Sequence, residues 1–245
     1  MKYPSLTNIK LTEKGIGAVL FLFLSIPFIM SLRCLADGTS IFSLKVFLDH
    51  WKTLLILLFF FLPALASTLK ASPLSKYLDW VFFVVCLFLL GFLLSQRFDK
   101  LVLYLGFAWM ILGQYLLSSW ALELKEPWYD PRFAKEDIEK PGRFPYPVTL
   151  VAGDVTTKAR LVNWGPQGFF VFCENNPCAA ISKISLQISI EGRNFVIPCD
   201  VISRWRGRGV GLRVCRQAGF AKAGFGAEDF WKVLEDRGFV PQFFV

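Results

Sequence analysis

Residues 53–69, TLLILLFFFLPALASTL, form a run of seventeen positions without one charged side chain. A helix needs roughly 20 mainly apolar residues, with a range of about 17–25, to cross the hydrocarbon core of a bilayer. Three more such runs lie at Ile16–Leu32, Tyr77–Leu94 and Leu101–Leu122, and Asp79 is the only charged residue in the four. None shows polar side chains at the 3.6-residue period of a soluble amphipathic helix. The first half of the chain therefore predicts an α-helical membrane bundle with about four transmembrane helices.

The distribution of charge divides the 245 residues into two parts. Residues 1–121 contain ten Lys or Arg and five Asp or Glu, whereas residues 122–245 contain seventeen and fourteen. One part suits lipid and the other suits water, which predicts a transmembrane domain at 1–124, a linker at 125–143 and a water-exposed domain at 144–245. The net charge of +8 is the sum of +5 for residues 1–121 and +3 for residues 122–245. Neither part is basic enough to favour nucleic acid as a partner.

The positions of Lys and Arg predict the orientation in the membrane. Ten of them lie in the N-terminal segment, the loop at residues 70–76 and the stretch that ends at Arg143, while the other two loops contain five. Cytoplasmic loops carry an excess of Lys and Arg. We therefore expect a multi-pass protein of the cytoplasmic (inner) membrane of a bacterium, with both termini in the cytoplasm.

Two features near the ends of the runs add detail. Trp51, Trp80 and Trp120 lie at run ends, where the amphipathic indole favours the lipid head-group region. Between the first two runs, a loop is predicted from Arg33 to Lys52. Its middle part, residues 41–48, either extends the second helix or lies along the membrane surface.

The apolar runs contain few groups that a transport path would need. Ionisable side chains inside a membrane usually mark the route of an ion or substrate. Apart from Asp79 near one end, the interiors of the runs offer only the uncharged polar residues Ser25, Ser67, Gln114, Ser118 and Ser119. We interpret Gln114 as a contact between helices rather than as part of a path. The first half thus reads as a membrane anchor or as an assembly surface for other membrane-protein subunits.

The second half has the pattern of short β-strands separated by turn residues. Alternation is clearest in residues 184–190, ISLQISI, and Glu191-Gly192 reads as a hairpin turn. Six short strands with glycine turns predict a small antiparallel β-barrel, because closure removes exposed sheet edges. The predicted strands are Val148–Ala152, Thr157–Asn163, Phe169–Cys173, Ile184–Ile190, Asn194–Trp205 and Gly209–Cys215.

A helix is predicted at Ala227–Arg237, with Phe230, Trp231, Val233 and Leu234 largely on one face. We expect it to pack against the barrel or against the membrane. Gly238 follows it as the terminating residue.

The second half resembles the PilZ domain family over about Arg143–Arg237. The resemblance rests on residues 159–171, ARLVNWGPQGFFV, and on residues 197–205, IPCDVISRW, followed by residues 209–214, GVGLRV. It implies a six-stranded barrel with a C-terminal helix. It also implies a site for cyclic di-GMP, formed by an R-x-x-x-R motif in the linker and a D/N-x-S-x-x-G motif on the barrel. Arginine suits such a ligand because its planar guanidinium binds phosphate with paired hydrogen bonds.

This sequence departs from both motifs. Arg143 has no Arg or Lys four residues downstream, and Gly165 stands where the barrel motif has serine, although Asn163 and Gly168 match. Losing one charge-assisted hydrogen bond costs about 1.5–3 kcal/mol. We therefore expect a PilZ-like domain that does not bind cyclic di-GMP strongly. In the alternative, a cyclic di-GMP receptor, the ligand contacts Arg143, Asn163 and Gly168, and Lys158 and Arg160 partly replace the missing arginine.

Catalysis and metal binding find no support in the sequence. The only histidine, His50, lies in the first half, and no two of the six cysteines form a C-x-x-C pair. No glycine loop of the phosphate-binding G-K-[ST] type is present. The expected protein is not an enzyme and needs no cofactor. Its expected role is that of a membrane-anchored binding or assembly subunit of an envelope complex of the exopolysaccharide, pilus or flagellar type.

Overall fold

The chain folds into two compact units. A computed structural model describes residues 6–39, 50–129, 146–165, 167–173, 182–190, 192–205, 209–215 and 227–236. One unit is Leu11–Leu124, and the other combines Met1–Lys10 with Lys125–Val245. The first ten residues thus group with the second unit and not with the predicted membrane domain, because a strand within them pairs there.

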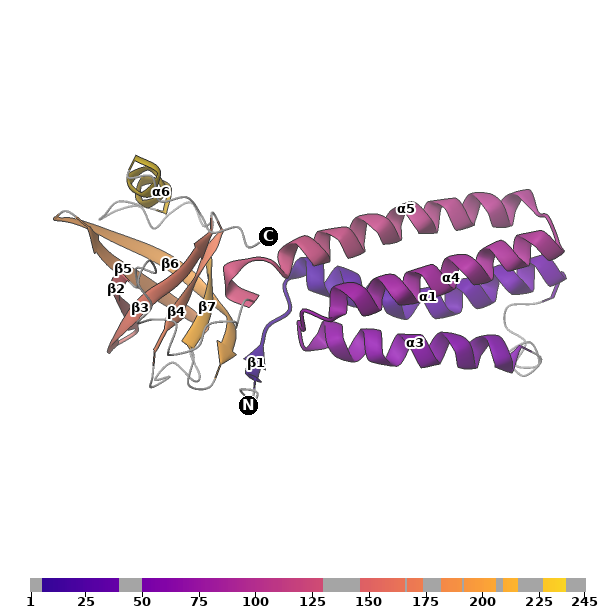
Figure 1. Cartoon of the computed structure of the whole chain (residues 1–245), viewed down its shortest axis with the longest axis horizontal. Coiled ribbons are helices and arrows are strands. Elements are labelled where there is room, and N and C mark those ends of the chain that lie inside the picture. Colours follow the sequence, from indigo (N-terminus) through magenta and orange to yellow (C-terminus); the bar gives the residue numbers. More distant parts are fainter. Residues whose placement is uncertain are drawn as a thin grey trace. The chain divides into compact units, whose positions relative to one another are not determined.

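The first unit consists of four helices that lie side by side (Figure 1). All four are long and apolar enough to cross a membrane, and each contains one of the four predicted runs. Helix α1 extends five residues beyond Leu32, so residues 33–37, predicted to begin a loop, are helical. The prediction for residues 41–48 falls outside the described residues. The helices are α1 (Glu13–Asp37), α3 (Trp51–Leu69), α4 (Ser75–Gln96) and α5 (Lys100–Glu123).

Polar residues fix the ends of two of these helices. The Thr12 side chain accepts a hydrogen bond from the Gly15 amide and caps α1, which ends at Gly38 in a left-handed conformation with φ of 67°. Asp99 Oδ1 caps α5 by accepting from the amides of Leu101 (2.7 Å) and Val102 (3.1 Å). These caps separate the apolar runs into distinct helices.

Aromatic packing joins α1, α4 and α5. The ring of Trp109 stacks against Phe21 at 5.0 Å and Phe83 at 5.3 Å between centroids. One turn further along α5, Gly113 leaves room for the same rings, since a methyl group there would lie 2.6 Å from Cε2 of Phe83. The bundle is therefore closely packed inside, as expected for helices whose association depends on shape rather than on exclusion of water.

The outside of the bundle is hydrophobic. Phe59 and Phe88 are each 73% exposed, and Tyr104 is 71% exposed. Among the described residues, every exposed large hydrophobic side chain lies in this unit except Val155 and Val196. Such a surface is unstable in water and stable in lipid, so the protein has the properties of a membrane protein.

Two polar side chains differ from their sequence-based interpretation. Trp120, predicted near the lipid head groups, is fully buried, and its Nε1 donates to Ser75 Oγ at 3.2 Å. Gln114, interpreted as a contact between helices, is exposed on the outside of α5, so it makes no such contact with the other described helices of this bundle. Trp51, by contrast, is 52% exposed at the start of α3.

The second unit contains a closed six-stranded antiparallel β-barrel, as predicted. The strand order is β6-β5-β2-β3-β4-β7, and β7 pairs again with β6 to close it. All six predicted strands are confirmed, with ends that differ by at most two residues. The strands are β2 (Tyr146–Ala152), β3 (Val155–Gly165), β4 (Gly168–Phe172), β5 (Lys183–Ile190), β6 (Arg193–Trp205) and β7 (Gly209–Val214).

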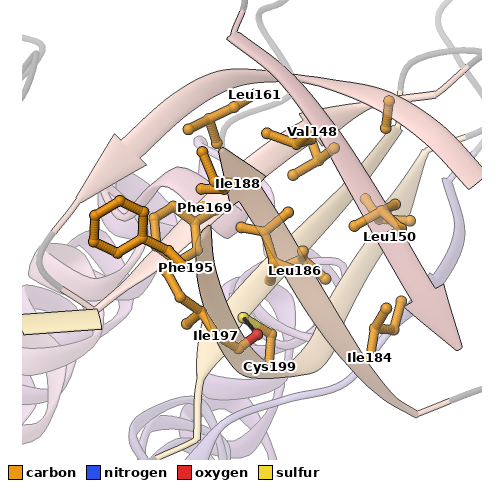
Figure 2. Close-up of a cluster of buried hydrophobic side chains, with 14 of the residues drawn as sticks. Val148, Leu150, Leu161, Phe169, Ile184, Leu186, Ile188, Phe195, Ile197 and Cys199 are labelled. Atoms are coloured by element: carbon orange, nitrogen blue, oxygen red, sulfur yellow. Dashed lines mark hydrogen bonds between the residues drawn. The ribbon is translucent and has the colours of Figure 1, made fainter. Parts of the chain in front are cut away.

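Alternate residues of the strands point inward and fill the barrel. Figure 2 shows Leu150, Leu186 and Ile197 among the side chains that meet in this core. Helix α6 (Ala227–Asp236) adds Phe230, which is 1% exposed and whose ring lies 5.6 Å from that of Phe195. The predicted C-terminal helix therefore exists and packs against the barrel.

A seventh strand, which the sequence analysis missed, extends the barrel at its edge. Strand β1 (Leu6–Ile9) pairs antiparallel with the last residues of β6, Ser203–Trp205. Strand β5 pairs with β6 only as far as Asp200. β1 therefore covers hydrogen-bonding groups of β6 that would otherwise form an open edge.

Candidate functional site

Four of the five predicted site residues lie on the outer face of β3 and β4. Strand pairing places Arg160 opposite Phe172, Asn163 opposite Phe170 and Gly165 opposite Gly168, and residues directly opposite each other share a face. Lys158 lies two residues before Arg160 and so faces the same side. The inner face is taken by core residues such as Leu161. Arg143, the fifth predicted residue, falls outside the described residues.

Gly168 is needed for space rather than for a special backbone angle. Its φ is not positive, unlike that of Gly153, Gly192 or Gly209. A methyl group on Gly168 would collide with the carbonyl oxygen of Leu212 and would lie 2.7 Å from Cζ3 of Trp128. The motif glycine thus lies directly beneath an indole ring of this same chain.

Trp128 comes from the short 3-10 helix η1 (Pro127–Tyr129), in the segment that the sequence analysis treated as a linker. It is 1% exposed, and Tyr129 beside it is 2% exposed. Two adjacent aromatic residues, Trp128 and Tyr129, follow the last apolar run by a few positions. Such a pair could have indicated that this segment packs on the barrel, but the prolines around it favoured a linker. Trp128 is the residue at this site that the sequence analysis missed.

The backbone of Trp128 is held as well as its ring. Its carbonyl oxygen accepts a short hydrogen bond from Ser203 Oγ on β6. Gly211 on β7 lies opposite Ser203, and a methyl group there would lie 2.6 Å from Trp128 Cα. Two glycines and one serine, from three neighbouring strands, therefore form a shallow surface that fits one tryptophan.

The same segment contacts the N-terminal strand. Tyr129 Oη donates to the carbonyl oxygen of Lys10 at 3.4 Å, and the Lys10 amide donates to the carbonyl of Ile202 on β6 at 2.9 Å. The chain that leaves α5 and the chain that enters α1 are thus both attached to the C-terminal half of β6.

The same outer face also carries a small buried cluster of Phe170 and Phe172 and, beside it, two basic residues. Lys158 and Arg160 are exposed, and within the described part of the chain neither forms an ion pair. Asn163 is half-buried at an irregularity in the pairing of β3 with β4. Exposed cations and a neighbouring amide are suited to an anion or to an acidic protein surface.

Two cysteine thiols of the barrel are poorly suited to nucleophilic chemistry. Burial raises the pKa of Cys199 well above its usual range, and Cys215 and Asp200 raise it further. Burial also raises the pKa of Cys215, to which Asp200 adds through a hydrogen bond and its charge. Both thiols stay protonated at neutral pH, whereas the thiolate is the reactive form.

Comparisons with known proteins identify no relative of this chain from which a function could be transferred. Neither the models of known protein families nor the curated proteins contain a match to this chain. Among the described residues, no group of three His, Cys, Asp or Glu side chains is placed to hold a metal ion. The distinctive feature of the site is the outer barrel face, with Trp128 at one end and Lys158 and Arg160 at the other.

Proposed function

We propose that this protein is a membrane-anchored, PilZ-like binding and assembly subunit of a bacterial envelope complex, of the exopolysaccharide, pilus or flagellar type. In this proposal the four helices lie in the cytoplasmic membrane, with both termini in the cytoplasm as the distribution of Lys and Arg favours. The barrel presents Lys158 and Arg160 to another subunit and binds cyclic di-GMP weakly or not at all.

The observation that carries this proposal is the docking of Trp128 on Gly168. In the resemblance to PilZ domains, this glycine and Asn163 belong to the ligand motif. Here the space above Gly168 is filled by a buried indole whose backbone is bonded to Ser203. A nucleotide at that position has to displace a tryptophan, and removing a large buried side chain from its site costs about 3–5 kcal/mol. Weak nucleotide binding follows from this cost.

Assembly is tested by purification of the full-length protein in mild detergent. We expect one membrane protein to be recovered with it at a fixed ratio in repeated preparations. The variant Lys158→Ala/Arg160→Ala should lose that protein, because it removes the exposed positive charges of the outer face. The control Lys100→Ala, which removes a charge at the start of α5, should retain it. Recovery of the unaltered protein as an isolated species would contradict the proposal.

One observation favours the alternative of a cyclic di-GMP receptor: Lys158, Arg160, Asn163 and Gly168 share one face. Calorimetric titration of the full-length protein in detergent separates the two functions. We expect no heat of binding up to several hundred micromolar nucleotide. Binding that disappears in both Arg143→Ala and Asn163→Ala would establish the receptor instead.

A further inference from the structure

Gln114 is a polar side chain on the lipid-facing surface of the bundle, far from either end of its helix. It lies nine residues before Glu123 and fourteen after Lys100, the ends of α5. With a rise of 1.5 Å per residue, these are about 13 Å and about 21 Å along the helix axis. A glutamine side chain at this depth is too short to reach the lipid head groups.

Gln114 is exposed and has no hydrogen-bond partner in the described part of the chain. A primary amide has two N–H donors and a carbonyl acceptor, and lipid tails can form hydrogen bonds with none of them. Ser25, in the middle of α1, is by contrast satisfied within its own helix, since its Oγ donates to the carbonyl of Phe21 at 2.6 Å. Gln114 therefore requires a partner from outside this bundle.

The neighbours of Gln114 form a continuous stripe on α5 at the 3.5-residue spacing used when two helices pack together. Tyr104 and Phe107 are exposed, as is Ile111 at 64%, and smaller residues follow towards the C-terminal end. A polar side chain at one position of such a stripe can specify the register and the number of helices. The stripe consists of Tyr104, Phe107, Ile111, Gln114, Ser118 and Ala121.

We infer that Gln114 pairs with Gln114 of a second copy of this chain, so that two bundles associate through α5 within the membrane. A carboxamide is complementary to itself, because each amide N–H donates to the other carbonyl oxygen. In a dimer whose two-fold axis lies along the membrane normal, identical residues meet at the same depth. A second copy therefore supplies the required partner at the required height. This inference goes beyond the proposed function and does not depend on it.

Oxidative cross-linking of the full-length protein in native membranes tests the pairing. Ile111→Cys places a thiol one turn from Gln114 on the same stripe and leaves the amide in place, so we expect a disulfide-linked dimer. Adding Gln114→Leu should weaken association by about three- to thirtyfold, the range for one hydrogen bond between membrane helices. The unaltered chain provides the background from the native cysteines.

Two controls make the test specific. Phe88→Cys lies at a similar depth on α4 and is equally accessible to lipid, being 73% exposed, so it should give no dimer above background. Adding Leu112→Ala, a change beside the stripe, to Ile111→Cys should leave the cross-link unchanged. The inference is overturned if Ile111→Cys gives no more dimer than Phe88→Cys, or if Gln114→Leu leaves its yield unaltered.

Discussion

Replacing Gly209 by alanine is expected to prevent closure of the barrel. Gly209 begins β7 with a φ of 129°, which side chains rarely tolerate, and strain of this kind costs about 1–3 kcal/mol. A methyl group there would also collide with the carbonyl oxygen of Val171 and would lie 2.9 Å from Cα of Phe172. Both neighbours are backbone atoms of β4, which cannot move without breaking the pairing of β4 with β7. We therefore expect a loss of more than about 4 kcal/mol, which is large for one substitution.

Gly192→Ala provides the matched control for Gly209→Ala. Gly192 also has a positive φ, 74°, but nothing lies within 4 Å of the added methyl group. Its cost should be the conformational strain alone, about 1–2 kcal/mol. The measurement is the amide-exchange protection of the barrel strands in the full-length protein. Equal loss of protection in the two variants would show that the collision with β4 is unimportant.

The elements that the sequence predicted well are those with a strong local pattern. Residues 184–190 alternate at period two because one side of the strand faces the barrel core, and β5 spans Lys183–Ile190. The four apolar runs can be recognised in the sequence because lipid tolerates almost no charge, so charged residues (Lys, Arg, Asp or Glu) lie at or near the ends of each helix. α1 passes the predicted end at Leu32 because Arg33 and Asp37 lie near the helix end, where polar side chains can leave the lipid.

The elements that the sequence missed depend on partners far along the chain. β1 has four residues and no turn, and it is stable only because β6, nearly two hundred residues later, leaves an edge beside it. Trp128 docks because Gly168, Gly211 and Ser203 from three strands leave room for its ring and backbone. Neither the pairing of β1 with β6 nor the docking of Trp128 can be read from a local sequence pattern, because both depend on residues far away in the chain.

The candidate site was partly predictable for the same reason. Alternation along β3 places Lys158 and Arg160 outside the barrel once Leu161 is assigned to the core. The role of Gly168 was not predictable, because the indole that lies over it belongs to Trp128, forty residues earlier in the chain. Because the Trp128 ring fills the space above Gly168, the residues that line this site do not by themselves show what it binds.

Thr68→Val is expected to destabilise the membrane unit strongly, because it removes the partner of a buried acid. Asp79 on α4 is 1% exposed, and the Thr68 hydroxyl on α3 lies 2.9 Å from its Oδ1 and 3.0 Å from its Oδ2. Valine has the same shape as threonine but donates no hydrogen bond. A buried polar group left without its partner costs about 1–3 kcal/mol, and more when it is charged. We expect a clear fall in the thermal unfolding midpoint of the purified protein in detergent.

Ser67→Ala provides the control for Thr68→Val. Ser67 Oγ donates to the carbonyl of Ala64 on its own helix, at 2.7 Å, whereas the hydrogen bonds to Asp79 come from Thr68. Its removal should change the unfolding midpoint little. A fall as large as that of Thr68→Val would show that loss of a hydroxyl from this turn of α3, and not loss of the Asp79 partner, is responsible.

The double variant Thr68→Val/Asp79→Leu decides what the acid is for. Replacing both members of a buried polar pair by apolar groups is often nearly neutral, so the double variant should be more stable than Thr68→Val alone. If the pair only joins α3 to α4, the double variant should still assemble with the membrane protein whose recovery is proposed above. An acid inside a membrane often marks the path of an ion, and such a role requires the carboxyl group itself. A double variant that is stable but inactive in the assembled complex would therefore contradict a purely anchoring role for the four helices.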